Sequence, residues 1–290
     1  MHNVQDDQNR GAALYVVATP IGNLRDITLR ALDVLKSVAL IAAEDTRVTR
    51  HLLDHFGISS KSFALHAHNE EAAAQRLIAA LHAGESVALV SDAGTPGVSD
   101  PGARAVAQVR QAGFAVIPIP GPNAAVTAFS AAGLSAAHFL FYGFLPSKSG
   151  ARSKALQALK SLPYALVFYE APHRVAETLD ALVEVLGGER HAVLARELTK
   201  LFEQIHSDTL AGLRQWIAMD ENRSRGEFVL LVEGAPAPDN AGLDQNTEQT
   251  LALLLAELPL KPAVALAAKI TGAPRNQLYA KALQLKPLDE

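Results

Sequence analysis

The chain has 290 residues, contains no cysteine and carries a formal net charge of −4 at neutral pH. The absence of thiols excludes a disulfide framework and a cysteine metal site. The slightly negative net charge argues against a protein that binds nucleic acid over most of its surface. No apolar run approaches the roughly 20 residues of a membrane span, and the polar residues 1–11 lack the apolar core of a signal peptide. We therefore expect a cytoplasmic protein of about two domains plus an appendage, with no membrane partner.

The first half alternates strand and helix patterns with short connections, which is typical of a parallel α/β sheet. In chain order, the expected strands are 14–18, 38–43, 87–90 and 115–119. The expected helices are 27–36, 46–56, 69–82 and 101–112, and Pro122 stands in the first turn of another. The continuous apolar run at 87–90 predicts a strand covered on both faces.

The regular alternation of strands and helices ends at a run of small residues at 131–137, and we place a domain boundary there. The expected strands beyond it are 139–142, 165–169, 192–195, 203–206 and 227–232. Only three helices separate them, at 150–161, 173–185 and 208–219. Because the strands at 192–195 and 203–206 follow each other directly, they predict a hairpin and hence a mixed sheet.

A proline-containing linker at 235–240 precedes a helical remainder. Helices at 263–271 and from Arg275 onward, joined through Gly272, read as a helix-turn-helix. The stretch 260–287 holds five basic and no acidic residues, which fits either a solvated helical face or contact with a nucleic-acid backbone. The predicted domains are thus an N-terminal α/β domain (12–134), a second α/β domain (135–235) and a helical domain (244–290).

A dense loop follows the strand at 87–90. Residues 91–102 include three glycines and two prolines, which let a backbone approach a ligand closely and limit the entropy lost on binding. Such loops, at the carboxyl ends of strands, are where open α/β sheets bind small molecules. Further polar clusters follow other expected strands, at 19–23, 44–47, 66–70, 121–123, 169–174 and 196–200. Each alone has a structural explanation, such as a helix cap or an ion pair, but together they favour a large cleft between two domains.

Several common sites are excluded by their signatures. No Gly-x-Gly-x-x-Gly follows the first strand, and no phosphate loop ending in Gly-Lys-Ser/Thr is present. His66 and His68 are expected to point to opposite faces of a strand, so that they do not form a metal site. We expect no metal ion.

Long motifs carry a resemblance to a known family. They are Thr-Pro-Ile-Gly-Asn-Leu-Arg-Asp-Ile-Thr at 19–28, Glu-Asp-Thr-Arg at 44–47, His-Asn-Glu at 68–70, the loop at 91–102, Pro-Gly-Pro-Asn-Ala at 120–124, Gly-Phe-Leu-Pro at 143–146 and Tyr-Glu-Ala-Pro-His-Arg at 169–174. In these residues the chain resembles the tetrapyrrole-methylase family, and within it the branch that modifies ribosomal RNA. The likeness runs from about residue 13 to the C-terminal helices.

The resemblance implies a homodimeric methyltransferase that binds S-adenosylmethionine (AdoMet) in the cleft between its two α/β domains. It also implies the reaction, methylation of the ribose 2′-oxygen of a decoding-centre cytidine in 16S rRNA within the small ribosomal subunit. Carried over by motif, the expected cofactor contacts are Pro20, Asp92, Ala93, Gly94, Thr95, Val98, Ala124, Ala125, Ala171, Glu227 and Phe228. The tetrapyrrole-modifying relatives have a Gly-x-Gly-Pro-Gly-Asp type of loop where this chain has residues 19–23, which favours RNA as the substrate.

A ribose hydroxyl loses its proton only well above neutral pH, so a proton acceptor would help the reaction. The candidates at the strand edge are Glu44, Asp45, Asp100, Glu170 and Glu197, and we favour the pair Glu44–Asp45 with Arg47 beside it. The alternative is that Asp45 only caps the following helix. RNA phosphates are expected to contact Arg25, Arg47, Arg50, Lys148, Arg152, Arg174, Arg196 and Lys200. Two other functions stay open, a small-molecule methyltransferase of the same fold and a non-enzymatic nucleic-acid-binding protein.

Overall fold

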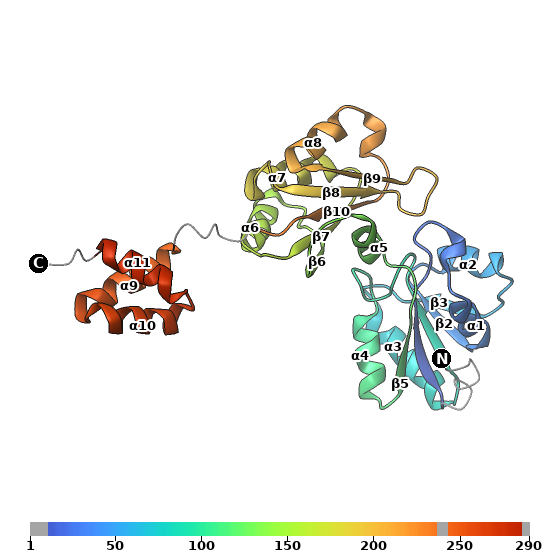
Figure 1. Ribbon diagram of the computed structural model, residues 1–290. Coiled ribbons are helices and arrows are strands. Elements are labelled where there is room, and N and C mark those ends of the chain that lie inside the picture. Colours follow the sequence, from blue (N-terminus) through green and yellow to red (C-terminus); the bar gives the residue numbers. More distant parts are fainter. Residues whose placement is uncertain (1–10, 237–242, 286–290) are drawn as a thin grey trace, which may run out of the picture. The chain divides into compact units, whose positions relative to one another are not determined.

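A computed structural model describes residues 11–236 and 243–285 (Figure 1). The chain divides into two compact units, one ending at Gly234 and one beginning at Ala235. The first unit contains two five-stranded sheets, and the second contains three helices. Residues 1–10, 237–242 and 286–290 lie outside the described residues. They include most of the predicted linker and the last residues of the predicted helical domain.

The first sheet is parallel throughout, with the strand order β3-β2-β4-β1-β5. Its strands are β1 (Ala13–Val17), β2 (Leu40–Ala43), β3 (Lys61–Ala64), β4 (Val87–Val90) and β5 (Ala115–Ile119). One face packs against α1 (Leu29–Ser37) and α2 (Thr46–His55), the other against α3 (Glu70–His82) and α4 (Ala103–Gln111). The predicted parallel sheet is confirmed, and β4 is buried along its whole length, as its apolar run predicts. The predicted strands lacked β3, whose side chains are exposed or half-buried at the sheet edge.

The chain leaves β1 and β4 in opposite directions, toward β2 on one side and β5 on the other. Such a reversal opens a crevice at the carboxyl ends of the two strands. Here the two departing loops are joined by an isolated bridge, in which Thr19 and Gly94 exchange backbone hydrogen bonds of 2.8 and 3.0 Å. The Thr19 hydroxyl also donates to the Ser91 carbonyl at 3.0 Å. The loops that follow β1 and β4 are therefore hydrogen-bonded to each other at the crevice.

The second sheet is mixed, with the order β6-β7-β10-β8-β9. Only β6 and β7 run parallel, and β8 and β9 form the predicted hairpin. Its strands are β6 (Phe139–Phe144), β7 (Ala165–Glu170), β8 (His191–Arg196), β9 (Gln204–Thr209) and β10 (Phe228–Val232). One face packs against α6 (Ser149–Leu159), α7 (Val175–Leu186) and α8 (Leu210–Ala218).

The opposite face of the second sheet packs against α5 (Ala124–Ala131), the helix that follows β5 of the first sheet. Ala125 and Ala128 are buried there against Val167, Val193 and Val229. Because small side chains let a helix approach a sheet closely, α5 brings the two sheets together within one unit (Figure 1). The predicted domain boundary at 134/135 falls just after this helix.

The second unit is a small bundle of α9 (Gln245–Glu257), α10 (Leu260–Thr271) and α11 (Arg275–Leu285). Its core includes Leu251, Leu255, Val264 and Leu278. Helix α10 ends at Gly272, which has a φ of 74°, a conformation that glycine adopts without strain. The predicted helix-turn-helix is confirmed. Within the described ranges, no helix combines the length and apolarity needed to cross a membrane.

Candidate active site

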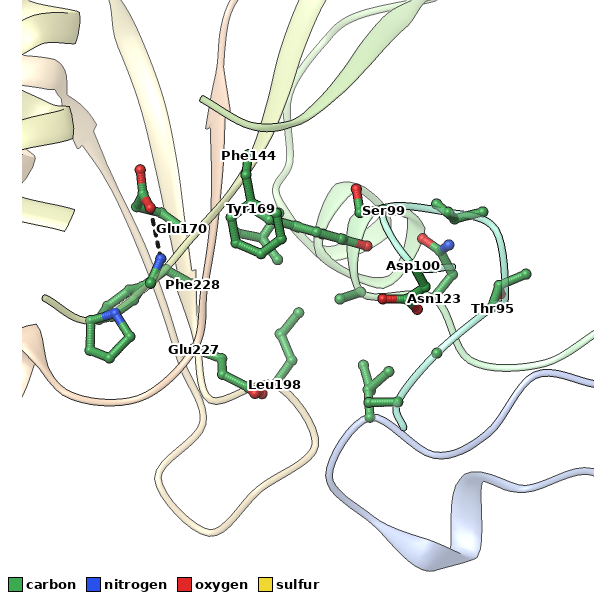
Figure 2. A pocket seen from close by; sticks show the side chains of 18 residues that line it. Thr95, Ser99, Asp100, Asn123, Phe144, Tyr169, Glu170, Leu198, Glu227 and Phe228 are labelled. Atoms are coloured by element: carbon green, nitrogen blue, oxygen red, sulfur yellow. Dashed lines mark hydrogen bonds between the residues drawn. The ribbon is translucent and has the colours of Figure 1, made fainter. Parts of the chain in front are cut away.

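The loops of the two sheets in the first unit enclose a cavity of about 340 Å³ (Figure 2). Small-molecule sites are typically concave, largely apolar and at least about 300 Å³ in volume. The residues that line it are Ile21, Ala93, Gly94, Thr95, Val98, Ser99, Asp100, Asn123, Ala124, Phe144, Tyr169, Glu170, Ala171, Pro172, Leu198, Glu227, Phe228 and Val229. The predicted cleft between strand-end loops is therefore present.

Most of the predicted cofactor contacts lie at this cavity. Those that line it are Ala93, Gly94, Thr95, Val98, Ala124, Ala171, Glu227 and Phe228. Pro20, Asp92 and Ala125 do not line it, although each is the immediate neighbour of a residue that does. Eight of the eleven expected cofactor contacts therefore line one cavity, and their role in binding stays a prediction.

Backbone geometry explains the glycine in the first cavity loop. Gly94 has a φ of 82°, which strains any residue with a Cβ atom, and its amide and carbonyl both pair with Thr19. The Thr95 hydroxyl donates to the Pro122 carbonyl at 3.1 Å, which joins this loop to the segment before α5. Two adjacent residues of the loop, Gly94 and Thr95, are thus tied to two different segments of the chain.

The N-terminus of α5 meets the second sheet at the cavity. The Asn123 side chain caps the helix by accepting a hydrogen bond from the Val126 amide at 3.1 Å. The Ala125 amide donates to the Tyr169 hydroxyl at 3.1 Å, and burial raises the pKa of that hydroxyl. Tyr169 also contacts the ring of Phe144 edge to face, with centroids 5.7 Å apart. Neither ring is among the predicted site residues, although both belong to motifs of the family resemblance.

A β-bulge lets the two sheets approach each other beside the cavity. The register of β6 against β7 shifts between Phe141 and Gly143, and Gly143 has a φ of 79°. A Cβ atom at this position would stand 2.7 Å from the Ser99 hydroxyl oxygen. Gly143 therefore allows the loop after β4 to pack against β6.

Three carboxylates gather where β2 and β4 end. The Asp45 amide donates to Asp92 Oδ1 at 2.9 Å, and the Asp92 amide donates to Glu44 Oε2 at 3.3 Å. Burial raises the pKa of both Glu44 and Asp92, and the neighbouring carboxylates add to the effect. Glu44 does not line the cavity, and Asp92 stands one residue before its wall.

Asp45 and Arg47 face solvent as a pair. Asp45 caps α2 by accepting the Arg47 amide at 2.8 Å, and its other oxygen contacts Arg47 Nη2 at 2.6 Å. Hydrogen bonding to Arg47 lowers the pKa of Asp45 to about 2, which makes it a weak proton acceptor at neutral pH. Glu44, Asp45 and Arg47, the favoured catalytic residues, therefore do not line the cavity. Asp45 has the geometry of the alternative, a residue that caps the following helix.

The basic residues predicted to contact RNA fall into two groups. Arg25, Arg47, Arg50 and Lys148 are exposed. The remaining predicted RNA contacts, Arg152, Arg174, Arg196 and Lys200, are buried or half-buried.

The side chains of that second group bind other parts of the protein. Arg152 is 5% exposed and contacts Glu177, while Arg174 donates to the Leu145 carbonyl at 2.6 Å and pairs with Glu170. The terminal nitrogens of these two guanidinium groups contact carbonyls and carboxylates of the protein itself, so the groups are part of the fold.

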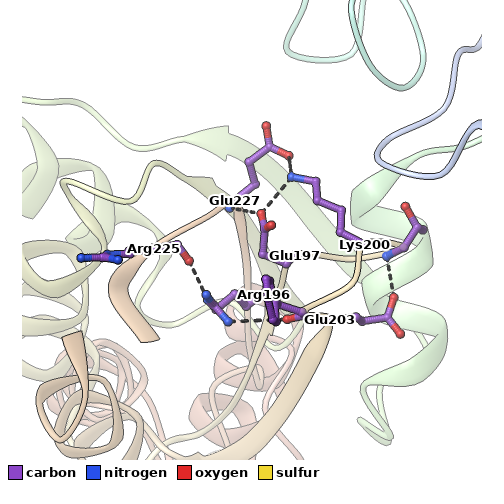
Figure 3. A network of polar contacts seen from close by, with 8 residues as sticks. Arg196, Glu197, Lys200, Glu203, Arg225 and Glu227 are labelled. Atoms are coloured by element: carbon purple, nitrogen blue, oxygen red, sulfur yellow. Dashed lines mark hydrogen bonds and ion pairs between the residues drawn. The ribbon is translucent and has the colours of Figure 1, made fainter. Parts of the chain in front are cut away.

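The turn between β8 and β9 is fixed by a polar network (Figure 3). Lys200 Nζ lies 2.8 Å from both Glu197 and Glu227, and Arg196 donates to the Arg225 carbonyl. On the other side the turn packs on Gly22, where a Cβ atom would stand 2.5 Å from Lys200 Cγ. The network holds Leu198 and Glu227 at the cavity wall.

His66 and His68 do not behave as the sequence predicted. They lie in the turn after β3 and not in a strand, and their rings meet edge to face with centroids 6.1 Å apart. The expectation that they point to opposite faces of a strand is wrong, both because they follow β3 and because residues i and i+2 of a strand lie on the same face. In the part of the chain that the structure describes, no group of three or more potential ligands is suited to a metal ion.

A parallel sheet and a mixed sheet that share a loop-lined cavity make the first unit an α/β protein with a site suited to a small molecule. The family described as tetrapyrrole (corrin/porphyrin) methylases matches residues 13–214, and a domain described as the RsmI C-terminal HTH domain matches residues 241–286. The chain belongs to the tetrapyrrole methylase family.

Within this family, the chain is similar over nearly its whole length to enzymes that share one name. A ribosomal RNA small subunit methyltransferase I from Escherichia coli O157:H7 is 53% identical over 284 residues, which cover 98% of this chain and 99% of that one. The enzyme of the same name from Vibrio cholerae serotype O1 is 55% identical, with 93% and 94% covered. The likeness thus extends over both units.

Solved structures show the same fold at low identity. Uroporphyrin-III-C-methyltransferase from Thermus thermophilus superposes with a TM-score of 0.55 at 22% identity, covering 77% of this chain and 94% of that one. The methyltransferase CobJ gives a TM-score of 0.58 at 20% identity, covering 77% and 95%. These likenesses establish the fold alone.

Proposed function

We propose that this protein is an AdoMet-dependent methyltransferase that modifies the ribose 2′-oxygen of a cytidine in the decoding centre of 16S rRNA. The observation that carries the proposal is the near full-length likeness to enzymes named for methylation of small-subunit ribosomal RNA. The target nucleotide and the ribose oxygen follow from the family resemblance of the motifs. We further propose a homodimer and a cytoplasmic location on the same ground.

The cavity suits a cationic cofactor with an apolar part. Its lining includes the carboxylates of Asp100 and Glu227, and none of the lining residues is a lysine, arginine or histidine. Phe228 and Val229, which follow Glu227 in the chain, and Leu198 supply apolar surface. AdoMet would supply a methyl group carried on a positively charged sulfur. The lining residues would hold it through carboxylates and backbone groups, which are favourable partners of positive charge and of hydroxyls.

The chain's contribution to such a reaction is positioning and exclusion of water. A rigid cleft aligns the reacting groups, and alignment alone can supply several kcal/mol of the barrier. The Thr19–Gly94 bridge, the cap at Asn123 and the Lys200 network each fix one side of the cavity. We also propose the division 12–134, 135–235 and 244–290, with the C-terminal helices adding contacts to RNA.

Binding and activity assays test the proposal directly. We expect calorimetry to detect AdoMet binding, and mass spectrometry to find one ribose methylation on small ribosomal subunits isolated from cells that lack the gene. Methylation of a tetrapyrrole with no methylation of the subunit would support the small-molecule alternative. Failure to bind AdoMet would support the non-enzymatic alternative.

The exposed residue Lys148 offers a test of RNA contact. We expect Lys148→Ala to raise KM for the ribosomal subunit severalfold and to lower the slope of log KM against log salt by about one, because one phosphate contact is lost. Affinity for AdoMet should not change. Lys61→Ala is the control, since Lys61 is exposed at the start of β3, at the sheet edge opposite the cavity loops. Equal salt slopes in Lys148→Ala and wild type would contradict the contact.

A further inference from the structure

The charges of the C-terminal unit are separated between its helices. In the described part of this unit, the acidic residues all lie on α9 or at its start, and they are Asp244, Glu248 and Glu257. Helices α10 and α11 have no acidic residue and four basic ones, which are Lys261, Lys269, Arg275 and Lys281. Two of the three helices therefore carry only positive charge.

Most of these cations are free to bind a partner. Lys281 Nζ lies 2.6 Å from Glu248 Oε1, and this pair joins α11 to α9. Lys261, Lys269 and Arg275 are exposed, and they form no ion pair with any residue that the structure describes. A surface of one charge sign raises the local concentration of an oppositely charged partner.

An exposed aromatic ring lies beside one of these charges on α11. Arg275, Tyr279 and Leu283 follow one another at intervals of four residues, so they share one face of the helix, and Asn276 lies next to them, three residues before Tyr279. All four are exposed, and Tyr279 is 40% exposed. Leu278, on another side of α11, is buried in the core of the bundle. We call the four exposed residues the α11 face.

The residue types of the α11 face suit an unpaired nucleotide. An aromatic ring stacks on an exposed base, an asparagine amide hydrogen-bonds to base edges, and an arginine binds phosphate. Double-stranded RNA does not offer these contacts to a helix, because its major groove is deep and too narrow to be read. The absence of acidic residues from α10 and α11 favours a polyanion over a protein surface of mixed charge.

We propose that the α11 face binds a single-stranded segment of the ribosomal RNA substrate, with Tyr279 stacked on an unpaired base and Arg275 on a neighbouring phosphate. The inference rests on the proposed function and specifies the form of RNA that the C-terminal helices contact. Lys261 and Lys269 attract the same strand through their charge. The contact contributes to the affinity for the substrate and not to the chemical step.

The first test measures binding of the full chain to a short labelled RNA by fluorescence anisotropy. The RNA has the sequence around the methylated cytidine and is used as a single strand and as a duplex with its complement. We expect the wild type to bind the single strand more tightly, and Tyr279→Ala to weaken this binding about tenfold, because a stacking contact is lost. Tyr279→Phe should bind like the wild type, since its ring also stacks. The control is Leu253→Ala, at an exposed apolar residue of α9.

Arg275→Gln tests the phosphate contact. The slope of log Kd against log salt for the single strand should fall by about 0.7, which corresponds to one phosphate of a single strand. Circular dichroism should show the wild-type helix content for this variant and for Tyr279→Ala, because both side chains are exposed. An unchanged salt slope would contradict the contact of Arg275 with phosphate.

Methylation of small subunits separates this inference from the proposed function. Tyr279→Ala should raise KM for the subunit severalfold, and the loss should appear in KM and not in kcat. Normal binding of the single strand by Tyr279→Ala overturns the inference, and so does a wild type that prefers the duplex. A higher KM with normal binding of free RNA would assign the α11 face to a protein of the subunit, which also overturns it. In each case an active wild type leaves the proposed function intact. A wild type that binds RNA through the α11 face but methylates no subunit overturns the proposed function alone.

Discussion

Replacing Glu170 with alanine is expected to lower the free energy of unfolding of the first unit by about 3–5 kcal/mol, because it leaves a charge without its partner. The Glu170 side chain is fully buried and accepts hydrogen bonds from the Thr178 hydroxyl at 2.6 Å and the Ala171 amide at 2.8 Å. Arg174 Nε lies 3.3 Å away as an ion pair, although its N–H makes no hydrogen bond. Removing the carboxylate therefore leaves two donors and a guanidinium unsatisfied at once.

Differential scanning calorimetry should show this loss as a fall in Tm of roughly 6–20 °C for the first unit. The matched control is Asp180→Ala on α7, whose carboxylate pairs with Arg214 at the surface. Exposed pairs contribute less than about 1 kcal/mol, so this control should shift Tm only slightly. Equal Tm values for the two variants would show that the Glu170 cluster does not stabilise the unit.

Glu170 also illustrates why a strand-end carboxylate was hard to interpret from sequence. Its position after a buried strand made it a candidate proton acceptor, and the same position placed Glu44, Asp45 and Asp100 in that set. Hydrogen-bond partners separate these residues, and the partners come from distant segments such as α7 and the loop after β4. Sequence order therefore located the edge of the sheet but did not rank the carboxylates on it.

The apolar and glycine-rich patterns were more informative. The run at β4 predicted a strand buried on both faces, and the loop after it lies at the cavity, because burial and tight turns are properties of local sequence. By contrast, β3 carries one exposed and three half-buried residues, so that its pattern has no strong period. Its place at the sheet edge is set by pairing with β2.

Arginine positions were the least predictable. Arg152 and Arg196 are buried, although arginine is usually exposed and a run of basic residues suggests RNA contact. Arg196 donates to the Arg225 carbonyl and to Gln204, both of which approach through the folding of the second sheet. A buried arginine needs acceptors from other segments, and the sequence around it does not reveal them.

The loop that presents Asp100 to the cavity should make the fold less stable. The pKa of its carboxyl is raised from 3.8 to about 6, so the folded state binds more protons than the unfolded state between these values. The free energy of unfolding therefore falls as pH rises through this window and stays lower above it. At 1.4 kcal/mol per tenfold, the full shift would correspond to about 3 kcal/mol, and partial exposure of the carboxyl reduces this to about 1–2 kcal/mol.

Asp100→Asn removes the ionisable group and with it this cost, so the variant should be more stable than wild type at pH 8 by about 1–2 kcal/mol. At pH 4 the wild-type carboxyl is protonated in the folded state, and the gain should be much smaller. Urea denaturation at the two pH values measures the difference, and Asp54→Asn, at an exposed carboxylate on α2, should show none. A gain in stability at pH 8 that is small at pH 4 would show that the charge of the buried carboxylate causes the difference. A variant less stable than wild type at pH 8 would instead assign this carboxylate to the structure of the loop.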